Sequence, residues 1–252
     1  MSPVFKRHFW LAGLLLSSLA SCVAGEHAPP DFAAIENVQA RKTAFFEYLQ
    51  PIAAKVNKSI LEDRSRLLDI AESKDSKGWW DRRFLKRLAE RYDVDPSDMQ
   101  TLLRRVDVVP VSLLLAQAAN ESNWGRSRFA TQGKALFGQW CFTPGCGMVP
   151  RGRPVGQTYE VRSFSTYRDS VKAYVHNLNT GDAYRELRLI REQERKRLSS
   201  PKGAELAEGL IRYSTRGEEY VEEIQSMIRF NKLDRFDDVA SACSHTEMDH
   251  RC

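Results

Sequence analysis

One glutamate stands at the end of an apolar segment, in a position that favours acid chemistry. Residues 110–122 read PVSLLLAQAANES, and most of them are apolar. The run predicts a helix that begins with Pro110 in its first turn, is buried on most sides, and stops at residues 123–125. Glu121 would then lie at the helix C-terminus, where desolvation and the negative end of the helix dipole both raise the pKa of a carboxyl group.

Such a carboxyl group suits glycoside chemistry. A carboxylic acid that stays protonated near neutral pH can protonate the leaving oxygen of a sugar. The other interpretation is a glutamate that frays into solvent at a helix end. Spacing alone does not separate the two interpretations.

A second carboxylate is the next requirement of a glycosidase. Between Glu121 and Asp169 the only acidic residue is Glu160. An inverting enzyme places its two carboxyl groups roughly 6.5–9.5 Å apart and a retaining enzyme places them roughly 5 Å apart. Glu160 could fill that role, or it could be a strand glutamate that faces solvent. A third route needs no second carboxylate, because the 2-acetamido group of the substrate can act as the nucleophile.

The residues around Glu121 resemble the signature of bacterial N-acetylglucosaminidases of glycoside hydrolase family 73. The family's motif Ala-x-Glu-Ser-x-Trp-Gly is present as residues 119–125, and GKALFGQW follows it as residues 133–140. The resemblance extends from Val109 to Leu233 and implies that Glu121 is the catalytic acid. Ala135 is a departure, since the family usually has asparagine before its Leu-Phe-Gly.

The resemblance also implies other site residues. It implies a second glutamate in a β-lobe, which here is Glu160. Residues 213–220, YSTRGEEY, resemble the family's Tyr-Ala-Thr-Asp-Pro-x-Tyr motif, so Tyr213 would line the cleft and hold the acetamido group or the attacking water. The other interpretation of Tyr213 is packing, with its hydroxyl capping a loop. The further candidates for substrate contact are Trp124, Phe137, Gln139 and Tyr220, although the place of Tyr220 at the start of a helix favours packing.

The rest of the chain predicts a mainly helical scaffold. Hydrophobic spacing predicts helices over 31–50, from 52 to about 68, 79–92 and 95–105, with Pro51 separating the first two. The expected inner positions of the first helix are Ile35, Val38, Phe45, Phe46 and Leu49. Trp79 and Trp80 could stack on sugars, but burial in the core is the favoured interpretation.

The second half of the chain predicts a β-lobe followed by more helices. Residues 139–164 are rich in glycine and proline, which favours turns and short strands, and 158–164 is the best strand. Helices are expected after 164 and over 184–198, 204–211 and 220–230. The predicted fold class is therefore α+β and mainly helical, a lysozyme-like glucosaminidase domain with a small β-lobe and an N-terminal helical extension.

The N-terminus predicts export. Lys6 and Arg7 precede an apolar run of about eleven residues, which fits a signal peptide and is too short to span a bilayer. The run ends in Leu-Ala-Ser-Cys, which resembles a bacterial lipobox and makes Cys22 the expected lipidation site. Ordinary cleavage after Ala20 or Ala24 is the alternative. The predicted organisation is a signal peptide (1–21), a tether (22–30), a helical extension (31–105), a catalytic domain (106–233) and a polar tail (234–252).

The cysteines agree with an oxidising compartment. If Cys22 carries lipid, four of the five cysteines remain as two local pairs, Cys141 with Cys146 and Cys243 with Cys252. The tail also contains two histidines near its cysteines, but an oxidising compartment favours a disulfide over zinc, and no metal or other cofactor is expected.

Charge identifies the class of partner only coarsely. The formal net charge is +5 and falls to +3 without Lys6 and Arg7. The basic residues are scattered, which disfavours nucleic acid and leaves the anionic cell wall.

The leading hypothesis is an exported peptidoglycan hydrolase on the periplasmic side of the envelope, membrane-anchored through Cys22. It would cut glycan strands at the β-1,4 bond on the reducing side of N-acetylglucosamine, with Glu121 as general acid. A lytic transglycosylase that uses the same glutamate is the first alternative. A non-catalytic lipoprotein that binds the cell wall is the second.

Overall fold

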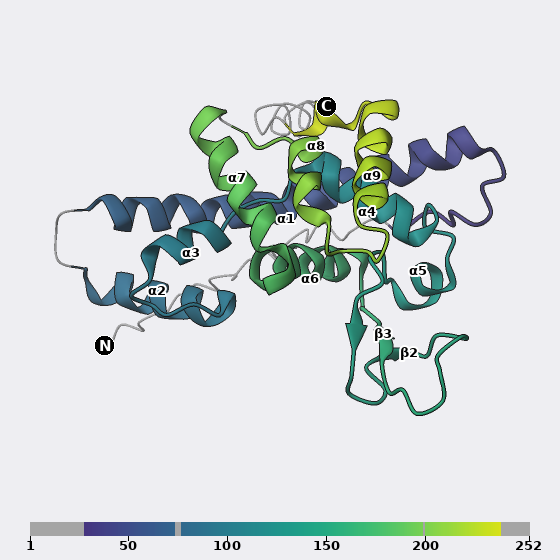
Figure 1. Ribbon diagram of the computed structural model, residues 1–252, viewed down its shortest axis with the longest axis horizontal. Helices are drawn as coiled ribbons and strands as arrows, with labels where there is room; N and C mark the ends of the chain where they lie inside the picture. Colours follow the sequence, from purple (N-terminus) through teal and green to yellow (C-terminus); the bar gives the residue numbers. More distant parts are fainter. Residues whose placement is uncertain (1–27, 74–76, 199, 238–252) are drawn as a thin grey trace, which may run out of the picture.

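A computed structural model describes residues 28–73, 77–198 and 200–237, and within these residues the chain is mainly helical with one small sheet (Figure 1). The α-helices are α1 (Val38–Glu72), α2 (Trp79–Tyr92), α3 (Met99–Arg105), α4 (Val111–Ser122), α5 (Arg128–Gly133), α6 (Tyr167–Thr180), α7 (Arg185–Arg197), α8 (Gly203–Leu206) and α9 (Glu218–Phe230). Short 3-10 helices are η1 (Asp182–Tyr184), η2 (Ala207–Leu210) and η3 (Leu233–Phe236). The predicted fold class, a mainly helical α+β domain with a small β-lobe, is confirmed.

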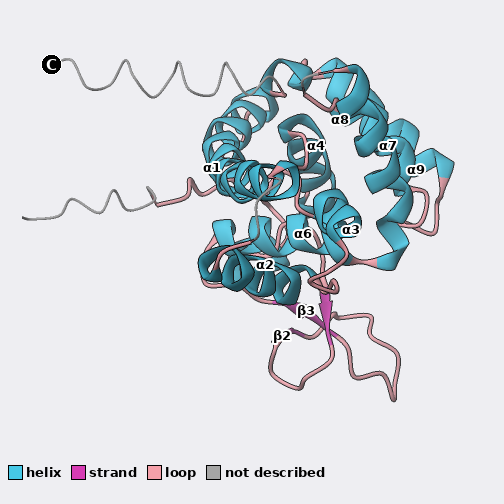
Figure 2. Ribbon diagram, turned by 90° about the vertical axis from the view of Figure 1, so that its left-hand side faces the viewer, coloured by secondary structure: helices cyan, strands magenta, loops and turns pink. Residues whose placement is uncertain are grey.

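Helix α4 is the centre of the molecule. Figure 2 shows it enclosed by other helices, and all its residues from Val111 to Ala119 are buried. The side chains supply the reason, because a run that is apolar nearly all round is stable only when other elements cover every side. Asn123 and Trp124 end the helix in the left-handed conformation, with φ of 50° and 57°. The predicted helix and its stop are confirmed.

The N-terminus of α4 is held by a residue from the far end of the described chain. The Asp237 carboxylate accepts hydrogen bonds from the Ser112 backbone N–H (2.8 Å) and the Ser112 hydroxyl (2.7 Å). It also accepts one from the backbone N–H of Gly203 (3.0 Å). An acceptor at a helix N-terminus satisfies donors that have no partner within the helix. The segment predicted as a polar tail therefore begins with residues that pack on α4, and its remainder lies outside the described residues.

Helix α1 runs through Pro51 without a break, so the predicted separation into two helices is wrong. Proline has no N–H, so the carbonyl four residues before Pro51 loses its helical hydrogen bond. Pro51 is solvent-exposed, so this carbonyl lies on the exposed side of the helix. Phe45 and Leu49 before the proline and Ile52 after it are all buried in the main core. Packing on both sides of Pro51 thus compensates for the missing hydrogen bond.

Two hydrophobic clusters lie along α1. The first half of α1 belongs to the main core around α4, while its second half packs with α2 and α3 in a smaller cluster that includes Leu67, Phe84 and Leu102. Val38 was expected inside and is 55% exposed, because the chain before it turns and places Phe32 in the core instead.

The tryptophans at the start of α2 are surface residues. Trp79 is 56% exposed and Trp80 is 71% exposed, so their predicted burial in the core is wrong. They occupy the first turn of α2, and their rings meet each other edge to face with centroids 4.4 Å apart. Two large aromatic side chains therefore face solvent on the helical extension.

The β-lobe projects from one side of the helical body (Figures 1 and 2). Its antiparallel strands are β1 (Trp140–Cys141), β2 (Gly147–Met148) and β3 (Glu160–Arg162), with β3 in the middle. A side chain at Gly147 would clash with the backbone of Val161, so the sheet requires glycine there. The predicted strand over 158–164 contains β3. Among the described helices, none has the length and apolar character that a membrane span requires.

Candidate active site

Glu121 lies in the last turn of α4 and is solvent-exposed. Its Oε1 accepts a hydrogen bond from the hydroxyl of Tyr220, 2.8 Å away. Desolvation by the surrounding protein raises the pKa of Glu121, and the hydrogen bond from Tyr220 opposes that rise without cancelling it. The side chain is thus reachable from solvent and keeps its proton to a higher pH than an ordinary glutamate.

A chain of hydrogen bonds connects Glu121 to the interior. The Tyr174 hydroxyl donates to the side-chain oxygen of Gln117, whose Nε2 donates to the Tyr220 hydroxyl at 2.8 Å, and that hydroxyl donates to Glu121. The first three side chains are at most 2% exposed. The network fixes the hydroxyl that faces Glu121, since buried polar groups retain their partners.

This network was not predicted from the sequence. One signal was available, because Gln117 is a polar residue inside an apolar helix and lies one turn before Glu121. A buried amide in such a place needs hydrogen-bond partners. The identity of those partners depends on α6 and α9, which are distant in the sequence.

Tyr213 lies next to this network but not on the acid. Its ring stacks on that of Tyr220, with centroids 5.2 Å apart and planes 12° apart. Its hydroxyl donates to the backbone carbonyl of Phe137 at 3.2 Å. This is the geometry of a packing tyrosine whose hydroxyl caps a loop, and in this conformation Tyr220 rather than Tyr213 contacts Glu121. A role of Tyr213 in binding substrate stays a prediction.

Phe137 and Trp124 support the site from behind. Phe137 is buried and stacks on Tyr174, with ring centroids 3.8 Å apart. Trp124 packs edge to face on Phe45 and Phe46 of α1, at 5.9 and 5.4 Å. Trp124 therefore packs the end of α4 on α1 and Phe137 packs on the middle of α6, and substrate contact by either side chain stays a prediction.

Gln139 lies at the base of the β-lobe. Its backbone carbonyl accepts a hydrogen bond from the Arg162 N–H at 2.8 Å, which extends the pairing of β1 with β3. Its side-chain oxygen is inaccessible to solvent and has no donor among the described residues. An unsatisfied acceptor of this kind is unusual in proteins, but its burial does not expose it to substrate, and substrate contact by Gln139 stays a prediction.

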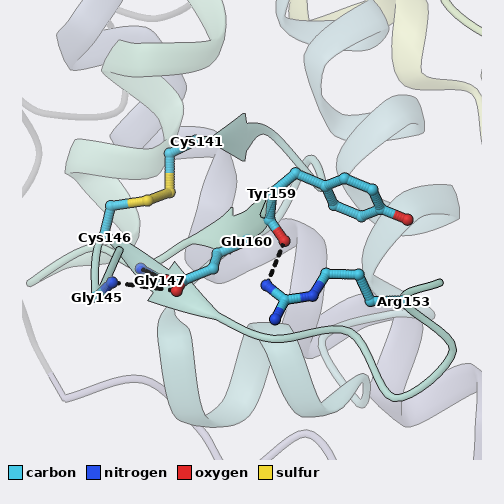
Figure 3. Close-up of a disulfide and its surroundings, with 7 residues drawn as sticks. All are labelled: Cys141, Gly145, Cys146, Gly147, Arg153, Tyr159 and Glu160. Carbon is cyan, nitrogen blue, oxygen red and sulfur yellow. Dashed lines mark hydrogen bonds between the residues drawn. A yellow bond between two sulfur atoms is a disulfide. The ribbon is translucent and has the colours of Figure 1, made fainter. Parts of the chain in front are cut away.

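Glu160 is held inside the β-lobe (Figure 3). Its two carboxylate oxygens accept hydrogen bonds from the backbone N–H groups of Gly145 (3.1 Å) and Gly147 (2.8 Å). These two bonds lower the pKa of Glu160, because they stabilise its charged form. The structure thus gives the two glutamates opposite environments, one favouring the acid and one the carboxylate.

The lobe contains the predicted disulfide between Cys141 and Cys146, beside Glu160 (Figure 3). The two sulfurs and a Glu160 oxygen lie within 4.8 Å of one another, a spacing that could hold a metal ion. The disulfide consumes both thiolates, however, and thiolates are the form that binds metal. Cys22, Cys243 and Cys252 lie outside the described residues.

Comparison with known proteins identifies the relatives of this chain. Residues 86–233 match the family described as mannosyl-glycoprotein endo-beta-N-acetylglucosaminidase. The chain is 34% identical over 212 residues to protein bax of Escherichia coli (strain K12), covering 81% of this chain and 74% of that protein. Among solved structures, the catalytic domain of the autolysin Auto from Listeria monocytogenes shares 16% identity, with a TM-score of 0.36, over 67% of this chain and 94% of that one.

The matched residues include α4 with Glu121, the β-lobe with Glu160, and α6 and α9 with the tyrosines of the network. Family and site therefore occupy the same part of the chain. Since the family match spans more than half of the sequence and a relative at over 30% identity covers most of it, this protein belongs to the glucosaminidase family.

Proposed function

We propose that this protein is an exported peptidoglycan hydrolase that cleaves the β-1,4 bond on the reducing side of N-acetylglucosamine, with Glu121 as its general acid. The observation that carries the proposal is the environment of Glu121. It is reachable from solvent, its pKa is raised by desolvation, and a buried network orients the hydroxyl beside it. A general acid needs its proton at the working pH, and the raised pKa of Glu121 favours the protonated form.

The hydrogen bonds of Glu160 indicate which group acts together with the general acid. Both of its oxygens already accept backbone hydrogen bonds, and the side chain is buried. Each oxygen keeps a second lone pair, but the lowered pKa makes Glu160 a weak base and its burial restricts the approach of water. The geometry therefore favours the 2-acetamido group of the substrate as the internal nucleophile, with Glu160 bracing the lobe.

The stereochemistry of the product tests this choice. Participation of the acetamido group gives a product with retained anomeric configuration, and glycan without N-acetyl groups would not be cut. Proton NMR of the first product formed distinguishes the two anomers. An inverted product would instead assign Glu160 as the base that activates water.

Replacement of Glu121 tests the main proposal. We expect Glu121→Gln to keep the fold and to reduce hydrolysis of purified sacculi at least about a hundredfold, since it removes a general acid. Glu62→Gln, an exposed change on α1, is the matched control. Products are reduced with borohydride and identified by mass spectrometry, and ends that reduce to N-acetylglucosaminitol should appear only with the parent and the control. A parental rate in Glu121→Gln would contradict the assignment.

A lytic transglycosylase is the second candidate, and one observation favours it. Such an enzyme needs a single acid, and Glu160 is both engaged and the only acidic residue between Glu121 and Asp169. It would release anhydro-muramoyl ends, which the same mass spectra would detect. Binding of the protein to sacculi without any new ends would instead indicate a non-catalytic wall-binding protein.

We also propose that the protein is lipidated at Cys22 on the periplasmic side of the envelope. The lipobox-like residues 19–22 support this location, and a glycan-cleaving domain meets peptidoglycan only outside the cytoplasm. Metabolic labelling with a clickable palmitate should mark the parent and not Cys22→Ser. Equal labelling of both would refute the anchor.

A further inference from the structure

A positively charged hollow lies between α1, α2 and α6, away from Glu121. Its volume is about 520 Å³, and its charged or ionisable lining residues are Lys55, Asp63, Arg91, Arg168, Lys172 and His176. A second hollow of about 640 Å³ adjoins it and shares Arg91, Lys172 and His176. The second hollow extends to residues 162–165, at the base of the β-lobe. In Figure 1, α6 lies between α2 and the lobe, so the combined groove follows α6 toward the lobe.

The charges in the groove are not balanced. Five lysine or arginine side chains line it, against the two carboxylates of Asp63 and Asp169. Asp63 is already paired with Arg91 at 2.9 Å, and Asp169 accepts a hydrogen bond from Thr166. Lys55 and Lys172 are exposed and have no ion pair within the described residues. The groove therefore presents cationic groups that are available to an anion.

The groove is concave and partly apolar. Val56, Ile60 and Val175 form its apolar lining between the charged residues. The rings of His176 and Tyr92 lie with their centroids 5.9 Å apart. Burial, followed by the charge of Arg91, lowers the pKa of His176 and so favours its neutral form. A flat basic patch would fit a membrane surface, whereas this lining fits a short chain that alternates carboxylates with small apolar groups.

Helix α6 belongs to both the groove and the candidate active site. Tyr174 points to α4 through its hydrogen bond to Gln117, while Lys172 and His176 line the groove. None of the residues of the hydrogen-bond network of Glu121 lines either hollow. The groove is thus a separate site on the same helix.

We propose that this groove binds the carboxylates of the peptide stems that peptidoglycan carries on its glycan strands. This inference rests on the proposed function, because it takes the substrate to be peptidoglycan. The lysines pair with the stem carboxylates and the apolar lining contacts the alanine methyl groups. Stem binding would select wall glycan that still bears its peptides over glycan from which they have been removed.

Direct binding is the first test. The probe is the synthetic peptide L-Ala-γ-D-Glu-L-Lys-D-Ala with free carboxylates, titrated into the full-length protein by calorimetry. We expect the double substitution Lys55→Ala/Lys172→Ala to weaken binding about tenfold, at roughly 0.7 kcal/mol for each exposed ion pair. Lys58→Ala/Lys86→Ala is the control, because Lys58 on α1 and Lys86 on α2 are exposed lysines outside the groove, and this protein should bind with the parental Kd.

Three comparisons would overturn the proposal. The first is equal affinity for the same peptide with every carboxylate amidated. The second is parental affinity in the Lys55→Ala/Lys172→Ala protein, whose folding is checked by circular dichroism. The third is binding of phosphatidylglycerol vesicles through Lys55 and Lys172 without any binding of the peptide, which would assign the groove to phosphate groups.

Hydrolysis gives an independent readout. We expect the Lys55→Ala/Lys172→Ala protein to lose discrimination between glycan with stems and glycan without them, through a higher KM for the former. An unchanged ratio of kcat/KM for the two substrates would contradict stem selection. Failure of the proposed function is distinguishable, because a protein that cuts neither glycan can still bind the free peptide.

Discussion

At the scale of single residues, two opposing effects act on one carboxyl group. Desolvation raises the pKa of Glu121, and the hydrogen bond from Tyr220 lowers it. The first effect penalises the charged form, while the second stabilises that form. Burial therefore has the larger effect on the pKa of Glu121, and the Tyr220 hydroxyl, which Gln117 and Tyr174 hold in place, adjusts it.

Tyr220→Phe tests this effect of the Tyr220 hydroxyl. The substitution removes a bond that stabilises the carboxylate, so the pKa of Glu121 should rise further. A general acid is active when protonated, and its activity falls as the pH rises through its pKa. We therefore expect the alkaline limb of kcat/KM to move to higher pH, although the maximal rate can fall because the acid is less well oriented.

The measurement is the pH profile of sacculus hydrolysis. Tyr167→Phe removes a buried hydroxyl that donates to the backbone carbonyl of Ala130, outside both the network and the groove, and should leave the limb in place. An alkaline limb that moves to lower pH in Tyr220→Phe would mean that Tyr220 does not control the proton of Glu121.

Glu121 and the direction of its pKa shift were predictable, because both follow from an apolar helix that ends in an acid. The partners of Glu121 were not. Tyr220 is 99 positions away in the sequence, and only the packing of α9 on α4 brings it to Glu121. For the same reason, Tyr213 and Tyr220 were both predictable as site residues, but the sequence could not show which hydroxyl contacts Glu121.

At the scale of elements, Asp107 connects helices that are remote in sequence. It precedes α4, is 3% exposed, and lies among Arg64 of α1 and Arg191 and Arg195 of α7. The shortest contact is 2.6 Å, from Arg195 to an Asp107 oxygen. Burial acts to raise the pKa of Asp107, but these three arginines together hold it below its ordinary value.

Asp107→Asn should be strongly destabilising. Without its carboxylate, Arg191 remains buried at 1% side-chain exposure with no counter-charge beside it. Breaking a buried pair in this way costs about 3–5 kcal/mol of the free energy of unfolding. Urea denaturation at pH 7 measures the loss, and Asp69→Asn on the exposed face of α1 is the control.

The pH dependence of this loss has a defined sign. Because the pKa of Asp107 is lowered on folding, its contribution is present above the ordinary pKa of an aspartate and disappears as the pH falls through the lowered value. The stability difference between the parent and Asp107→Asn should therefore shrink in acid. A difference that stays constant down to pH 2 would show that ionisation of Asp107 is not its source.

Several element boundaries, such as those of α2 and α7, were predictable from hydrophobic spacing and from glycine and proline. The start of α1 at Val38, its end at Glu72 and the short helix α5 were not, and Pro51 shows why such predictions fail. A proline inside a helix is a reliable sign of a break only when nothing else holds the helix straight. Here the buried residues on both sides of Pro51 pack into a single core, and that core is formed by elements that the local sequence does not specify.

At the scale of the whole molecule, a helical body and a small β-lobe are stabilised in different ways. The body has an extended hydrophobic core, whereas the lobe depends on three short strands, the Cys141–Cys146 disulfide and the hydrogen bonds of Glu160. Trp140 and Phe142 of the lobe are 59% and 67% exposed, so the lobe buries little apolar surface. The lobe therefore relies on covalent and polar contacts.

Loss of the Cys141–Cys146 disulfide should consequently destabilise the β-lobe and leave the helical body unchanged. A disulfide that closes so short a loop contributes about 2 kcal/mol, and it does so locally. For Cys141→Ser/Cys146→Ser we expect a raised KM for sacculi and faster proteolysis within the lobe, while the helical melting transition stays near that of the parent. Circular dichroism at the helical minimum and limited proteolysis are the measurements. A large fall in the melting temperature of the body would contradict this separation.

The fold class of the whole molecule was predictable from the sequence, but the packing of its elements was not. The density of glycine and proline after α5 indicated a lobe, and the apolar sequence of α4 indicated a central helix. The sharing of one core by the first half of α1 and by α4 was not predictable, because it depends on which apolar faces meet and not on how each is spaced.

The contact of Asp237 with the start of α4 also has a consequence for the synthesis of the chain. Asp237 follows Ser112 by 125 positions, so a ribosome has already made α4, with its acid, long before the residue that caps α4 exists. A nascent chain that ends before Asp237 carries Glu121 but lacks the contact that secures its helix. The helix that carries Glu121 is thus synthesised well before the contact that secures its N-terminus can form.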